Sequence, residues 1–193
     1  MSAFLGPIHY WLYHKIQFQE QLTKALLQGE ETLLSSVDSL CGVVESKPLE
    51  EVIDTGNIHG WLQGQILIAE SRYANAVAGL LNENNLTLEE IRKKVLNFGK
   101  EYPLKGTNAA DVYKELQDLL LDGMPCDHVN LLVEQQENKV IFKRTADLHS
   151  SHWKNIGLEG NIYYLLRNSL LEGMLYHSSI SYREEGDLNI IFQ

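Results

Sequence analysis

Apolar side chains recur every three or four residues through most of the first 120 positions, which is the period of an amphipathic helix. Pro48 ends one such run, because proline has no N–H for the preceding turn. The segment Thr87–Glu90 has the form of a capping box and opens another run. The predicted helices cover residues 7–29, 30–47, 58–81, 87–100 and 108–121.

The period changes from 3.6 to 2 at Pro125, which favours strands. Two hairpins are predicted, one turning at Glu137-Asn138 and one at 185–187, with a helix over 158–176 between them. Their strands cover residues 129–134, 139–145, 178–182 and 188–192. We therefore predict an α+β fold in which a helical bundle, 1–123, precedes a hairpin–helix–hairpin region, 124–193. The hairpins should form one antiparallel sheet packed on the 158–176 helix, and both regions should share a core as one compact domain.

The N-terminal region contains an internal repeat of seven residues at identical spacing, fifty positions apart. A partial third copy begins at Gly160 and has Tyr163 in the place of the histidine. The paired positions are Gly6 and Gly56, Ile8 and Ile58, His9 and His59, Trp11 and Trp61, Leu12 and Leu62, Ile16 and Ile66, and Glu20 and Glu70. The repeat predicts that residues 6–20 and 56–70 are equivalent helices with both tryptophans buried.

The histidine and glutamate of each copy share one helical stripe but lie roughly 16 Å apart, too far to touch. If the two helices pack antiparallel, His9 comes level with Glu70, and His59 with Glu20. Two His–carboxylate pairs could then bind a ligand, or each pair could donate two ligands to a divalent metal. Tyr163 could face the same cavity. The alternative is a packing face in which a buried histidine is simply hydrogen-bonded to a glutamate. The candidate ligand-binding residues are His9, Trp11, Glu20, His59, Trp61, Glu70 and Tyr163.

The second copy has Gly60 and Gly64 where the first has Tyr10 and His14. Each glycine inside a helix costs about 1 kcal/mol relative to alanine. This cost predicts a close approach of the helix backbone to another helix or to a ligand. A loose helix start is the alternative.

A second candidate site lies at the open end of the first hairpin, where thiol, imidazole and carboxylate groups gather. Such a set is typical of zinc or iron sites. It would equally suit nucleophilic catalysis with Cys126 attacking and His149 or His152 as the base. A free cysteine is also commonly a small buried hydrophobe. The candidate metal ligands are Cys126, His128, Asp147, His149 and His152.

The net charge and the composition limit which classes of partner the protein is expected to bind. The net charge of −10 argues against nucleic acid and against an anionic membrane surface. No apolar run reaches the ~20 residues of a membrane span, and the first residues lack the features of a signal peptide. With only Cys41 and Cys126, no disulfide framework is expected, so a cytoplasmic location is predicted. The sequence does not decide whether the protein forms a homodimer.

The C-terminal stretch contains Gly173, then Gly186-Asp187 in a hairpin, and Phe192 near the end. These residues resemble the tail of vinyl-reductase-type small-molecule-binding domains, over residues 160–193. The resemblance implies an α+β ligand-binding domain with a pocket between helices and sheet. That family often has cysteines where this chain has Tyr182 and Ile190, which argues against metal binding through the tail.

Together these patterns predict a cytoplasmic protein that binds a small molecule or a divalent metal in a cavity between helices and sheet. Its role would be that of a sensor, carrier or chaperone. The alternative is a hydrolytic or metal-assisted enzyme that uses Cys126, His149 and His152. A structural domain that binds a protein partner is the third hypothesis.

Overall fold

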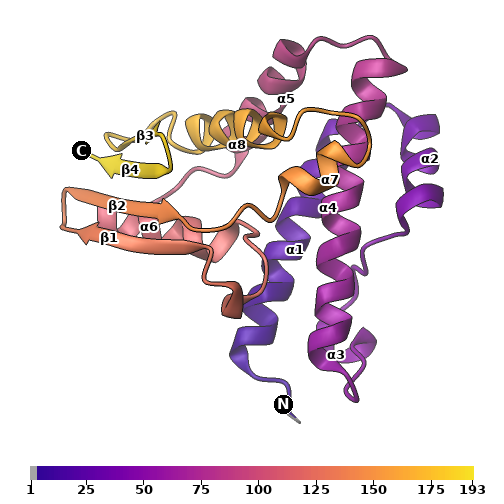
Figure 1. Ribbon diagram of the computed structural model, residues 1–193, viewed down its shortest axis with the longest axis horizontal. Helices are drawn as coiled ribbons and strands as arrows, with labels where there is room; N and C mark the ends of the chain where they lie inside the picture. The colour runs from indigo at the N-terminus through magenta and orange to yellow at the C-terminus, as the bar shows by residue number, and fades with distance from the viewer. Residues whose placement is uncertain (1–3) are drawn as a thin grey trace.

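The computed structural model describes residues 4–193 and has the predicted α+β architecture, with helices first and an antiparallel sheet last (Figure 1). Two one-turn helices, α3 and α7, were not predicted, and they are too short to show a period. The helices are α1 Pro7–Leu26, α2 Glu31–Cys41, α3 Leu49–Val52, α4 Ile58–Asn82, α5 Leu88–Glu101, α6 Ala109–Leu119, α7 Ser150–Lys154 and α8 Asn161–Met174. The strands are β1 Asn130–Gln135, β2 Lys139–Arg144, β3 Ser181–Glu185 and β4 Leu188–Phe192.

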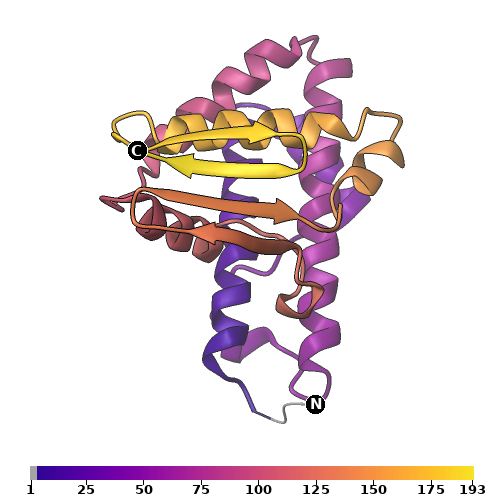
Figure 2. The ribbon, with the colours of Figure 1, turned by 60° about the vertical axis from the view of Figure 1, so that its left-hand side comes forward.

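The two repeat helices, α1 and α4, stand side by side and run in the same direction (Figures 1 and 2). Their first turns meet, since the rings of His9 and His59 lie 5.6 Å apart. The antiparallel arrangement is therefore wrong. Its physical reason is the connection: α2 runs back along the bundle, so the chain returns to the starting end before α4 begins.

Both repeats are helical, as predicted, and equivalent positions bury the same apolar side chains. Leu12 and Leu62 are fully buried, as are Ile16 and Ile66 to within a few per cent. The two tryptophans are only half-buried and pack at the edge of this apolar cluster. The two tryptophans occupy equivalent positions, but the prediction that they are buried is wrong.

The four strands form a single antiparallel sheet in the order β1-β2-β4-β3. Figure 2 shows α6 and α8 behind this sheet, with α8 behind β3 and β4. Val140 and Ile191 are paired across β2 and β4 and belong to the same core cluster as residues of α1, α4, α5 and α8. Ordinary side-chain alternation on β2 thus carries the core from the sheet into the bundle.

The outer strand β1 contains a bulge. Leu132 pairs with Phe142 and Glu134 pairs with Ile141, so Val133 is an extra residue without a partner on β2. The side chains of Leu131, Leu132 and Val133 are exposed. A bulge of this kind bends the strand and interrupts its regular hydrogen bonding.

Helices α5 and α8 lie backbone to backbone at two glycines, Gly99 and Gly173. A Cβ on Gly173 would lie 2.1 Å from the carbonyl oxygen of Leu96 and 3.0 Å from Cα of Gly99. The predicted close approach of backbones therefore occurs here and not at Gly60 or Gly64. The three atoms nearest to a Cβ on Gly60 would all belong to Asn57, the capping residue of its own helix, and a Cβ on Gly64 would meet nothing within 4 Å.

Replacing Gly173 by alanine should lower the free energy of unfolding by about 1–3 kcal/mol, because the new methyl group would collide with rigid backbone. Gly64→Ala is the matched control and should raise it by about 0.5–1 kcal/mol, since the helix gains propensity in open space. Urea denaturation measures both. Equal effects of the two substitutions would contradict the tight crossing.

Candidate functional site

The repeat histidines do not form His–carboxylate pairs. His9 is buried, and its Nδ1 accepts a hydrogen bond of 2.9 Å from the backbone N–H of Gly6. It therefore caps the first turn of α1. In the second copy His59 is exposed, and the side chain of Asn57 performs the capping.

The repeat glutamates both hold a buried cation, but neither of these is a repeat histidine. Glu20 makes two hydrogen bonds, of 2.9 and 3.0 Å, with the guanidinium of Arg72, a fully buried side chain. Arg72 also donates to Asp38, which attaches α2 to the bundle. Glu70 instead contacts His149 at 3.1 Å from Oε1 to Nδ1. Both glutamates thus serve as anchors between segments.

The five candidate metal ligands do not converge. Among residues 4–193, no three His, Cys, Asp or Glu side chains are placed to hold a metal ion. Cys126 and His128 are exposed, whereas His149 is buried. Asp147 accepts hydrogen bonds from the backbone N–H of His149 and Ser150, which holds the turn before α7.

Cys126 is also not paired with either of the two histidines predicted as its catalytic base. His152 lies half-buried in α7. Both ring nitrogens of His149 face carboxylates in the interior, so neither is free to take a proton from the exposed thiol of Cys126. The structure does not assemble this cluster.

The interior instead contains a chain of four charged side chains from four segments. His149 lies between Glu70 of α4 and Asp122, with its Nε2 3.4 Å from Asp122 Oδ1. Asp122 also pairs with Arg167 of α8, at 3.0 Å from Oδ2 to the guanidinium. The imidazole stacks on the ring of Tyr163, with centroids 3.8 Å apart.

This arrangement sets the charges of its members. Burial would lower the pKa of His149, but the nearby carboxylates of Glu70 and Asp122 outweigh burial and raise the pKa to about 9. Burial would raise the pKa of Asp122, but Arg167 and His149 outweigh burial and hold this pKa well below its usual value. At neutral pH the chain therefore alternates negative, positive, negative and positive, which limits the cost of burial.

The predicted ligand residue Tyr163 does not reach the surface. Its ring is buried and lines a small hollow of about 30 Å³ with Gln19 and Arg167, which is room for about one water molecule. Gln19 Nε2 is buried and lacks a hydrogen-bond partner within the described residues.

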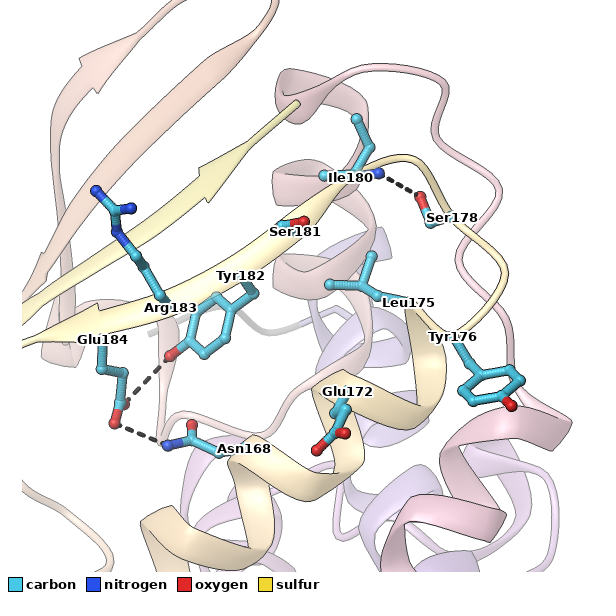
Figure 3. Close-up of a pocket in the computed structure, with 10 residues that line it drawn as sticks. All are labelled: Asn168, Glu172, Leu175, Tyr176, Ser178, Ile180, Ser181, Tyr182, Arg183 and Glu184. Carbon is cyan, nitrogen blue, oxygen red and sulfur yellow. Dashed lines mark hydrogen bonds between the residues drawn. The ribbon is translucent and has the colours of Figure 1, made fainter.

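A hollow of about 480 Å³ opens between α8 and β3 (Figure 3). This volume is within the range of small-molecule pockets. The lining is mixed, with Leu175 and Ile180 beside polar side chains such as Ser178 and Ser181. The lining residues are Asn168, Glu172, Leu175, Tyr176, Ser178, Ile180, Ser181, Tyr182, Arg183 and Glu184.

The polar wall of the hollow is fixed by a hydrogen-bond network centred on Glu184. Its carboxylate accepts from Asn168 at 2.9 Å and from Arg144 at 3.0 Å. The hydroxyl of Tyr182 lies 3.2 Å from Glu184 and 2.6 Å from Asn189 Oδ1. Burial and the Glu184 carboxylate raise the pKa of Tyr182, so its hydroxyl remains a donor.

One acceptor in this wall has no partner. Asn168 Oδ1 is buried without a hydrogen bond within residues 4–193. The amide cannot profitably turn over, since its Nδ2 already donates to Glu184 and the reversed amide would place two acceptors together. Sequence reasoning missed this wall, although Asn168 and Glu172 stand four residues apart on the predicted helix and so share a face.

Comparison with protein-family models, with curated proteins and with solved structures finds no match to this chain. The resemblance of residues 160–193 to vinyl-reductase-type domains therefore stays a prediction. Within residues 4–193, no helix combines the length and apolar composition that crossing a membrane requires.

Because of the buried charges, the stability of the protein should decrease at alkaline pH. The folded pKa of His149, about 9, lies above its ordinary value of 6.5, so its stabilisation is complete below about pH 6.5 and is lost as the pH rises through 9. The contribution of His149 to the free energy of unfolding should fall by roughly 3 kcal/mol over this interval. In His149→Gln this fall should disappear.

His14→Gln is the control, because His14 is exposed on α1. It should keep the wild-type pH dependence when unfolding is followed in urea from pH 6 to pH 10. A His149→Gln protein that loses stability over this interval as steeply as wild type would rule out a charged His149 in the fold.

Proposed function

We propose that this protein binds a small molecule in the hollow between α8 and β3, and that the ligand carries an amine. The observation that supports this proposal is an acceptor-rich wall in a hollow of about 480 Å³. Glu172 is exposed on α8 and forms no ion pair within the described residues. Its carboxylate is therefore free to pair with a ligand ammonium group.

The other groups of the hollow favour the same charge. Tyr182 forms part of the wall, and the face of a tyrosine ring attracts a cation. The orphan Oδ1 of Asn168 would gain a donor from an amine after a small movement of its neighbours, which would relieve a cost of about 1–3 kcal/mol.

The cations near the hollow are already engaged. Arg183 pairs with Glu185 at 2.8 Å and extends over the ring of Phe192. Lys100 lies 3.8 Å from the ring centroid of Tyr176. A carboxylate ligand would consequently meet carboxylates and acceptors, whereas an amine would meet complementary charge.

Benzylamine and benzoate are matched probes, since they share a ring and differ in the sign of the polar group. We expect benzylamine to bind in ligand-observed NMR titrations and benzoate not to bind. Glu172→Gln should weaken benzylamine at least about tenfold, because a hydrogen bond to a charged group is worth about 1.5–3 kcal/mol.

Glu159→Gln removes the same charge from an exposed position outside the hollow and is the control. It should leave benzylamine binding unchanged. Equal binding of both probes, or equal losses in the two variants, would show that the amine is not held by the α8–β3 wall.

A further inference from the structure

Lys15 is a buried lysine that makes no ion pair with any of residues 4–193. Its side chain projects from α1 and the residue is 4% exposed. Within residues 4–193 the ammonium group forms no ion pair and no hydrogen bond, and it lies 4.0 Å from the ring centroid of Trp11. Buried lysines are ordinarily paired, so this one is unusual.

Lys15 is one of the residues that line a hollow of about 200 Å³ between α1, the α6–β1 connection and the start of β1. Trp11 and Met124 supply apolar walls, whereas Asp122 and His128 supply polar ones. The hollow is on the α1 side of the molecule and shares no lining residue with the α8–β3 hollow.

Burial makes the neutral form of the Lys15 amine more favourable than it is in water. Burial lowers the pKa of Lys15, Asp122 and Asp118 oppose this effect, Arg167 adds to it, and the result is about 8. His128 is the other titratable group that lines the hollow. At pH 7 roughly one Lys15 in ten is then neutral, against roughly one in three thousand for an ordinary lysine.

We propose that Lys15 is a reactive amine that captures a small aldehyde as a Schiff base inside this hollow. The neutral nitrogen attacks the carbonyl carbon and forms a carbinolamine. This intermediate loses its hydroxyl group as water, and the C=N bond replaces the C=O bond. One aldehyde and one amine thus give one imine and one water, with no oxidant or reductant.

The surroundings of Lys15 suit the product as well as the amine. A protonated imine keeps the positive charge at the same place, where Asp122 lines the hollow and Asp118 is hydrogen-bonded to the indole of Trp11. The indole ring beneath the nitrogen would stack on the planar C=N group. The volume limits the aldehyde to a small one, below the size of most drug-like ligands.

The test uses the full chain with benzaldehyde and sodium cyanoborohydride, which reduces the imine to a stable amine that peptide mass spectrometry locates. Lys24 is the internal reference, since it lies on the same helix and is half-exposed. At pH 7 Lys15 should be labelled at least about tenfold faster than Lys24, because a larger neutral fraction outweighs its weaker basicity.

The pH profile separates a special amine from an accessible one. Labelling of Lys15 should level off above about pH 8, because its neutral fraction then approaches its maximum. Met124→Trp, which fills the hollow, should slow the labelling of Lys15 and leave the labelling of Lys24 unchanged. Labelling of Lys15 no faster than Lys24, or unaffected by Met124→Trp, would overturn the proposal.

Discussion

Four charged side chains that meet in the interior hold together segments that are distant in the sequence. Glu70, His149, Asp122 and Arg167 come from α4, the turn before α7, the connection after α6, and α8. Any one of them alone would be expensive to bury, and removing one partner of a buried pair typically costs 3–5 kcal/mol. This buried series of charges is therefore stable only when all four segments are in place. The position of α8, and with it the wall beside β3, depends on this condition.

The internal repeat acquires a physical meaning from the same contacts. Glu20 and Glu70 occupy one position of the repeat, and each holds a buried cation supplied by a later part of the chain. Parallel packing makes this possible, because both carboxylates lie at the same level of the bundle. The first glutamate attaches α2 through Arg72, and the second attaches the segment before α7.

Much of the fold could be predicted, because hydrophobic period and capping residues are local signals. The capping box of Thr87 and Glu90 is present, and the last strand has the predicted bounds. The direction of α4 could not be read from the repeat, since it depends on how α2 returns the chain. The candidate metal ligands do not come together within residues 4–193 for a similar reason. His149 is close in sequence to the hairpin end, but it turns inward to carboxylates from elsewhere. Lys15, Arg72 and Arg167 were missed although each interrupts an apolar helical face, which is the one local sign of a buried charge.

The bulge in β1 has a consequence for how copies of this protein meet. A straight outer strand with exposed leucine and valine side chains would offer a continuous row of amide and carbonyl groups to another sheet. Here the extra Val133 shifts the spacing of that row partway along a strand of six residues. A neighbouring strand could match one side of the shift but not both. The bulge thus works against pairing of this exposed apolar edge with the sheet of a second copy.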